Sequence, residues 1–70
     1  MYRLGLVYDE GKGVPRNLML AHMWYDLAAA HGSAEAAYKR DQLARRMSAD
    51  ELAESRRLAK AWEEGEATNF

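Results

Sequence analysis

Residues 4–32 constrain the fold of this chain more than any other stretch. They read LGLVYDEGKGVPRNLMLAHMWYDLAAAHG, in which two segments of helical periodicity flank a bend that contains two glycines. Gly11 can adopt the left-handed conformation that ends a helix, and Asn17 is a good N-cap for the helix that follows. We therefore expect helices over residues 1–10 and about 18–31, joined by a loop.

The second half of the chain also has helical periodicity. It predicts a third helix over about 34–47 and a fourth over about 49–63. Between them, Ser48 and Glu51 form a capping box, in which each side chain would bond the backbone N–H of the other residue. Alanine, leucine, arginine and glutamate dominate the composition, whereas β-branched residues are almost absent. These features together predict an all-α fold of four helices.

The second helix is apolar on nearly all sides, so we expect it to be buried between its neighbours. His22 and Asp26 would then form a narrow exposed polar strip. Gly5 lies inside the first helix, where glycine costs about 0.5–1 kcal/mol relative to alanine. A packing reason is therefore expected, the simplest being the close approach of a neighbouring helix backbone at Gly5.

The sequence offers little material for catalysis. His22 and Asp26 are four residues apart and could act as a general base with its orienting carboxylate. However, no nucleophile or third ligand accompanies them, and the chain has no cysteine. His22 and His31 lie on different helix faces, which argues against a shared metal ion. We therefore predict no catalytic residues, no metal site and no cofactor.

Size and charge place further limits on function. Seventy residues make at most one small domain, and the formal net charge of -1 points to neither a strongly acidic nor a strongly basic partner. No apolar run approaches the roughly 18 residues that span a bilayer, so no membrane partner is predicted. The compartment stays open between the cytoplasm and, if a signal peptide was removed, the periplasm or the exterior.

The pattern LGxxYxxGxGV, a polar cap and AxxWYxxAAxxG resembles the Sel1-like repeat, a relative of the tetratricopeptide repeat. The matching residues are Leu4, Gly5, Tyr8, Gly11, Gly13, Val14, Ala21, Trp24, Tyr25, Ala28, Ala29 and Gly32. Asn17 stands where the family usually has Asp. The match covers one whole repeat, residues 1–33. The motif fails after Ala36, and residues 34–63 resemble a degenerate helix pair that closes a repeat array, followed by a flexible tail over 64–70.

The resemblance implies antiparallel helix pairs stacked into a right-handed α/α superhelix. Proteins of this kind are non-catalytic scaffolds that hold another protein or peptide on a concave surface. Members serve in signalling, in protein quality control and in bacterial envelope or host-interaction systems. The residues predicted for partner contact are Tyr8, Tyr25, His22 and Asp26.

Two further expectations concern partners. Repeat units usually need about three neighbours for stability, and this chain has barely two. We therefore expect self-association through the end formed by Leu4, Val7 and Tyr8, or a longer parent protein. The alternative function is a small helix-turn-helix module that binds nucleic acid through residues 39–60, which hold seven basic and four acidic residues. The turn lacks the usual glycine, and acids are mixed with the bases, so a solvated end face is the favoured interpretation.

Overall fold

The computed structural model describes residues 1–63 and 65, and these form four helices. The helices are α1 (Tyr2–Glu10), α2 (Leu18–Ala30), α3 (Ala34–Ala44) and α4 (Ala49–Glu63). The predicted all-α fold is confirmed. Apart from Gly65, the predicted tail over 64–70 lies outside the described residues.

The helix boundaries follow from local capping. Gly11 ends α1 with φ at 70°, in the left-handed region where a Cβ atom is disfavoured. The Asn17 side chain accepts a hydrogen bond from the backbone N–H of Leu20 at 3.1 Å. In the predicted capping box, the Glu51 N–H donates to Ser48 Oγ at 3.1 Å, and the Ser48 N–H donates to Glu51 Oε1 at 2.8 Å. These side chains satisfy backbone donors that the first turn of a helix leaves unpaired.

The third helix ends at Ala44, three residues before the predicted end at Met47. The chain tightens there into turns, in which Arg46 N–H donates to Leu43 O and Met47 N–H to Ala44 O. Such bonds between residues three apart often close the last turn of a helix. Met47 nevertheless packs against the buried cluster that contains Leu43. The apolar periodicity of the sequence therefore extends to Met47, beyond the end of the helix, because the turn keeps the Met47 side chain against the core.

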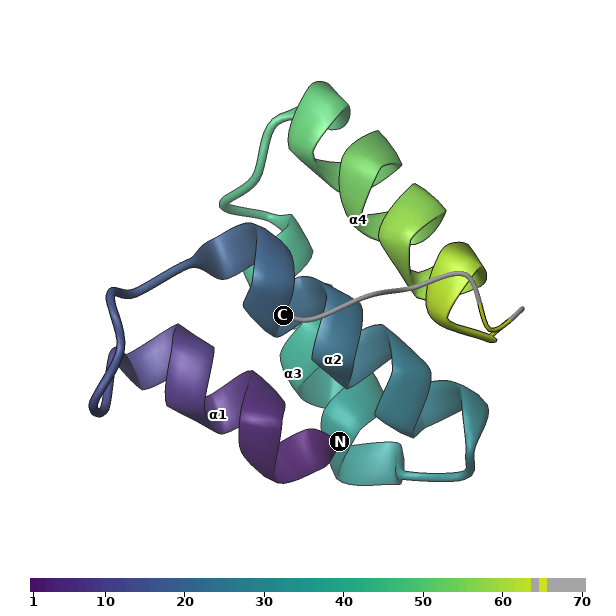
Figure 1. Cartoon of the computed structure of the whole chain (residues 1–70), viewed down its shortest axis with the longest axis horizontal. Coiled ribbons are helices and arrows are strands. Elements are labelled where there is room, and N and C mark those ends of the chain that lie inside the picture. The colour runs from purple at the N-terminus through teal and green to yellow at the C-terminus, as the bar shows by residue number, and fades with distance from the viewer. Residues whose placement is uncertain (64, 66–70) are drawn as a thin grey trace.

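Helix α2 is the element against which α1, α3 and α4 all pack. Figure 1 shows α2 between α1 and α4, with α3 beside it. Its buried residues form a nearly continuous run, as expected for a helix enclosed on most sides. They are Ala21, His22, Met23, Trp24, Tyr25, Leu27 and Ala28. Toward α4, Trp24 meets Trp62 edge to face, with ring centroids 5.0 Å apart.

Gly5 is buried because the aromatic ring of Tyr25 occupies the space beside it. A Cβ atom added at Gly5 would overlap Cδ1 and Cε1 of that ring. The neighbour expected at Gly5 was a helix backbone, so this expectation was wrong in its detail. The group that lies close to Gly5 is the flat aromatic ring of Tyr25 on α2 and not the α2 backbone. Glycine is needed here for space, since its conformation is ordinary helix.

The Tyr25 ring has little room to move away from Gly5. It is fully buried, its hydroxyl donates to Asp9 Oδ2 at 2.9 Å, and the Tyr2 ring lies against it with a centroid distance of 5.8 Å. Burial first, and then the hydrogen bond to Asp9, raise the pKa of the Tyr25 phenol well above its ordinary value. The phenol therefore stays protonated and keeps donating to Asp9.

We predict that Gly5→Ala destabilises the protein despite the better helix propensity of alanine. The new methyl group would overlap the Tyr25 ring, and overpacking of this kind typically costs about 1–3 kcal/mol. Urea denaturation followed by circular dichroism would measure the free energy of unfolding.

The same substitution in a Tyr25→Leu background is the control. Leucine has no ring beside Gly5, so Gly5→Ala should there be neutral or stabilising, by about 0.5–1 kcal/mol. A gain in stability from Gly5→Ala in the otherwise unchanged protein would show that the ring does not impose the glycine.

Candidate functional site

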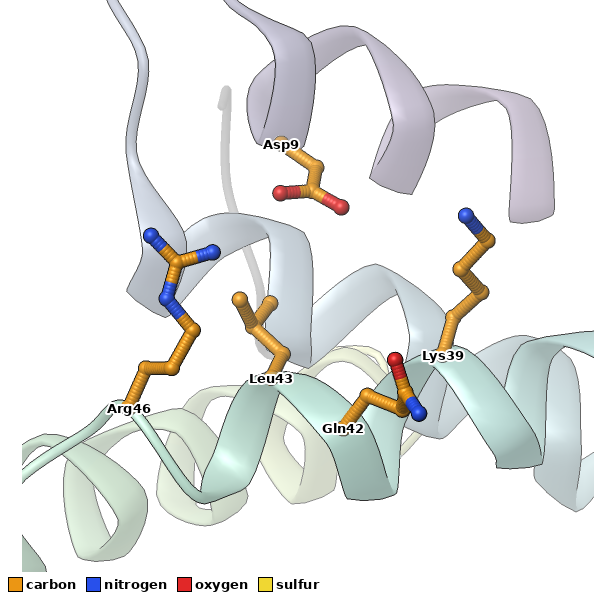
Figure 2. Close-up of a pocket in the computed structure, with 5 residues that line it drawn as sticks. All are labelled: Asp9, Lys39, Gln42, Leu43 and Arg46. Atoms are coloured by element: carbon orange, nitrogen blue, oxygen red, sulfur yellow. The ribbon is translucent and has the colours of Figure 1, made fainter.

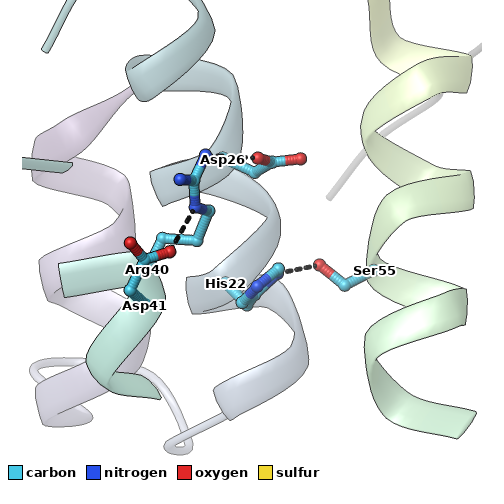
Figure 3. A network of polar contacts seen from close by, with 5 residues as sticks. All are labelled: His22, Asp26, Arg40, Asp41 and Ser55. Carbon is cyan, nitrogen blue, oxygen red and sulfur yellow. Dashed lines mark hydrogen bonds and ion pairs between the residues drawn. The ribbon is translucent and has the colours of Figure 1, made fainter. Parts of the chain in front are cut away.

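The residues predicted to form an exposed polar strip, His22 and Asp26, are separated in the structure. His22 is only 3% exposed, and its Nδ1 lies 2.7 Å from the hydroxyl oxygen of Ser55 on α4 (Figure 3). The prediction of an exposed strip was therefore wrong for His22. The physical reason is that α4 packs over this side of α2, so the imidazole finds its partner across a helix interface.

Asp26 makes its polar contact with α3. Its Oδ1 accepts a hydrogen bond from Arg40 Nη1 at 3.0 Å, and Arg40 Nε donates to Asp41 Oδ1 at 3.1 Å (Figure 3). The side chains of Asp26 and Arg40 are each about one-third exposed. A partly exposed ion pair adds little stability by itself. This one joins α2 to α3 through a single contact between Arg40 and Asp26.

Sequence reasoning missed Ser55, which is fully buried. Its position could have been found, because Ser55 follows Leu52 by three residues and precedes Ala59 by four, on the inward face of α4. A serine hydroxyl within hydrogen-bond distance of a histidine nitrogen is an arrangement found in enzymes that use nucleophilic catalysis. Here both side chains are enclosed between α2 and α4, where a substrate has no access. The pair satisfies two buried polar groups and links the helices.

Burial is the main cause of a lowered pKa at His22. Among nearby charges, Asp26 and Asp41 act in the opposite direction, whereas Arg40 and Arg56 lower the pKa further. A neutral imidazole suits this position, because one ring nitrogen meets the Ser55 hydroxyl in an interface with little water.

The predicted partner-contact residues differ in exposure. Tyr25 is fully buried and His22 nearly so, which assigns both side chains to helix packing rather than to a free surface. Tyr8 is half-buried and packs against the clusters on both sides of α2. Asp26 is also half-buried. Contact of Tyr8 or Asp26 with a partner stays a prediction.

A groove lies between α1 and α3, and we refer to it as the α1–α3 groove. One part has a volume of about 120 Å³ and is polar (Figure 2). It is lined by Asp9, Lys39, Gln42, Leu43 and Arg46. The other part has a volume of about 300 Å³ and is more apolar. It is lined by Tyr2, Ala34, Glu35, Tyr38 and Lys39. Lys39 lines both parts, so they adjoin along the same pair of helices.

The groove runs along the length of both helices. Tyr2 at the start of α1 shares a pocket with Glu35 near the start of α3, and Asp9 near the end of α1 shares one with Arg46 just beyond α3. Helices α1 and α3 are therefore aligned in the same direction. Neither motif positions nor charge patterns indicated this groove, because its lining comes from two helices separated by the whole of α2.

The basic residues over 39–60 are partly engaged in contacts within the chain. Arg40 joins Asp26 and Asp41, and Arg57 forms two hydrogen bonds with Glu54 on the same helix, at 2.9 and 2.5 Å. The helix-turn-helix alternative gains no support from these contacts and stays a prediction. Within residues 1–63 and 65, no group of three metal-ligating side chains comes together, and no helix is long and apolar enough to cross a membrane.

We predict that His22 makes the protein less stable as the pH falls below about 6.5, the ordinary pKa of histidine in an unfolded chain. Because its pKa is lowered in the folded protein, the unfolded chain binds more protons in this range. Between about pH 7.5 and 5.5, the free energy of unfolding should fall by up to about 1 kcal/mol more in the unchanged protein than in His22→Gln. Urea denaturation at the two pH values would measure it.

The His22→Gln comparison removes other pH effects, since the pair between His31 and Glu63 is present in both proteins. Equal losses of stability in the two proteins would contradict the lowered pKa at His22.

Comparison with known proteins identifies the first half of the fold. Residues 1–33 match the family model of the Sel1 repeat. No match to this chain was found among curated proteins or among solved structures. The matched range contains α1, the loop and α2, and it ends at Ser33, whose hydroxyl caps α3 by accepting from the Ala36 N–H. Residues 1–33 of this chain are therefore similar to the Sel1 repeat in sequence, and they fold as the helix pair that the sequence pattern predicts.

Proposed function

We propose that this protein is a non-catalytic adaptor that binds another protein through the α1–α3 groove. The observation that carries the proposal is an open groove that half-buried Tyr2 and Asp9 of α1 line together with aromatic and charged side chains of α3 and the turn after it. Of the latter, Glu35, Tyr38 and Arg46 are exposed. By contrast, the groups with catalytic potential, His22 and Ser55, are buried against each other. The Sel1 repeat at residues 1–33 supports an interaction role, since such repeats mediate contacts between proteins.

We further infer that residues 34–63 act as a capping helix pair for the repeat. In support, α4 buries Ser55 and Ala59 toward α2 and presents a charged opposite face. That exposed face includes Glu51, Arg56, Arg57 and Lys60. A polar outer face is what a terminal helix of a repeat array requires for solubility.

Site-specific photo-crosslinking in cells would test the adaptor role. A photoreactive amino acid replaces Tyr38 in the groove, or Lys60 on the exposed face of α4 as the matched control. Both positions are solvent-exposed, so neither replacement should disturb the fold. We expect a discrete covalent protein adduct from position 38 and none from position 60. Equal labelling at both positions, or no adduct from position 38, would count against the groove as the interaction site.

Self-association through the first helix is a second interaction that we infer. Leu4 on α1 is 42% exposed, and Val7 on the same helix is half-buried. Covering Leu4 with a second copy would remove apolar surface from water, worth about 25 cal/mol per Å². Tyr8 contributes less than expected, since it already packs on α2.

Sedimentation velocity over a range of concentrations would test this self-association. We expect the average sedimentation coefficient to rise with concentration in the unchanged protein and to stay at the monomer value in Leu4→Lys. Lys60→Gln serves as a control that alters charge on the opposite side of α2. A folded monomer at every concentration would refute the inference.

A further inference from the structure

We propose that α4 is a helix that opens and closes on α2 under the control of His22. At neutral pH the uncharged imidazole keeps α4 closed on α2. In mildly acidic solution a proton on His22 favours an open state, in which α4 has left α2 while α1, α2 and α3 stay packed together. This inference goes beyond the adaptor function, because it concerns the interface between α2 and α4 and does not involve the α1–α3 groove.

Helix α4 is attached to the rest of the fold through one interface. Within residues 1–63, α4 packs on α2 and has no interface of similar size with α1 or α3. Figure 1 shows α2 lying between α4 and α1. Of the 15 residues of α4, Ser55 and Ala59 are buried. Elements with few buried contacts open at a lower free energy than the core of a protein. An opening confined to α4 therefore breaks one small interface.

The local contacts of α4 do not depend on its position on α2. The capping box joins Ser48 to Glu51, and Glu54 accepts a hydrogen bond from Arg57 Nε at 2.9 Å, so both contacts lie within α4 and its N-cap. Just before the cap, Met47 packs against the buried cluster that contains Leu43 of α3. The chain is therefore anchored up to Met47, and α4 can move as a unit from Ser48 onward.

His22 is the ionisable side chain of α2 that α4 encloses. Its Nδ1 lies 2.7 Å from the hydroxyl oxygen of Ser55, near the middle of α4, and both side chains are buried (Figure 3). The Ser55 hydroxyl is neutral, so it offers no negative charge to a protonated imidazole. When α4 leaves, the imidazole returns to water, where it takes up a proton with an ordinary pKa of about 6.5.

The charged groups around His22 do not compensate a proton on its ring. Asp26 on α2 and Asp41 on α3 favour the charged imidazole, but both carboxylates are bound by Arg40 of α3 (Figure 3). Burial, which is the largest effect, lowers the pKa of His22 in the closed state, and Arg40 and Arg56 of α4 lower it further. The open state therefore binds a proton more readily than the closed state does.

The pH range of the opening follows from this difference in proton binding. Above about pH 6.5 the imidazole is neutral in both states, and the closed state keeps its full stability. As the pH falls below about 6.5, the open state gains a proton that the closed state does not bind, so the ratio of open to closed molecules rises. Between about pH 7.5 and 5.5 this ratio should rise by up to about tenfold.

Opening uncovers an apolar side of α2. The residues that α2 buries there together with Ala59 of α4 are Met23, Trp24 and Leu27. The ring of Trp24 also meets that of Trp62 on α4. At neutral pH this side of α2 is kept from water. Helix α4 thus acts as a pH-dependent cover for it.

A second histidine of α2 responds to acid in the opposite direction. The Nε2 atom of His31 lies 3.1 Å from Oε1 of Glu63 at the end of α4. Protonation of His31 turns this contact into an ion pair, which favours the closed state. Both side chains are about half exposed, and exposed ion pairs contribute little. The effect of His22 should therefore dominate, and single variants separate the two.

Hydrogen exchange of the backbone amides, measured by NMR spectroscopy on the ¹⁵N-labelled full chain at pH 7.5 and 5.5, would test the proposal. Dividing the rate of an unstructured peptide at the same pH by each measured rate gives a protection factor, which removes the direct effect of pH on exchange. An isolated helix of this length is marginal in water, so amides of open α4 exchange. Those near Ser55 and Ala59 should be less protected than amides of α2 at both pH values. Their protection should fall by up to about tenfold from pH 7.5 to 5.5.

Two single variants assign the pH dependence to one histidine. In His22→Gln, the amide can still bond to Ser55 but takes up no proton, so the protection of α4 should not fall in acid. In His31→Gln, the ion pair with Glu63 is lost, and the fall should be at least as large as in the unchanged protein. Circular dichroism would confirm that each variant is folded. If His22→Gln does not fold, the unchanged protein and His31→Gln still decide the question.

Four results would overturn the proposal. Equal protection of α4 and α2 amides would show that α4 opens only when the whole chain unfolds. The other three are a protection of α4 that does not depend on pH in the unchanged protein, an equal fall in His22→Gln, and loss of the pH dependence in His31→Gln. The adaptor function is tested separately, because crosslinking at position 38 reports on the α1–α3 groove.

Discussion

The contact between the Tyr25 ring and Gly5 determines how the helices of this protein fit together. The absence of a side chain at Gly5 lets α1 lie against the ring, and the ring lets its hydroxyl reach Asp9 on α1. The same ring supports Tyr2, and it belongs to the buried cluster that contains Leu43 of α3. One aromatic side chain of α2 therefore sets the positions of α1 and α3, and through them the shape of the groove between those helices.

The polar side chains of α2 extend this arrangement to the remaining helices. His22 meets Ser55 of α4, and Asp26 meets Arg40 of α3, so these two polar side chains of α2 have partners from two different helices. A buried polar group without such a partner would be costly. These pairs therefore favour one way of packing the helices over alternatives with similar apolar burial, and they also account for the residues that resembled a catalytic pair.

The proposed interaction site depends on the same packing. Asp9 is engaged by Tyr25 and Arg16, which leaves Lys39 and Arg46 as the groove cations without an ion pair in residues 1–63 and 65. The core contact at Gly5 and the charge of the groove are thus connected through Asp9.

The sequence by itself determined the four helices, their caps and the similarity of residues 1–33 to the Sel1 repeat. These depend on local information: helical periodicity, the left-handed glycine at Gly11, and the side chains of Asn17, Ser48 and Glu51, which bond within a few residues. Only the tertiary structure decided which polar groups are buried and where a ligand could lie. His22 was expected at the surface because α2 alone shows a polar strip there, and the partner that buries it is 33 residues away. The α1–α3 groove likewise joins residues from separate helices. Its existence depends on the relative placement of those helices, which packing around Tyr25 fixes and local sequence patterns do not encode.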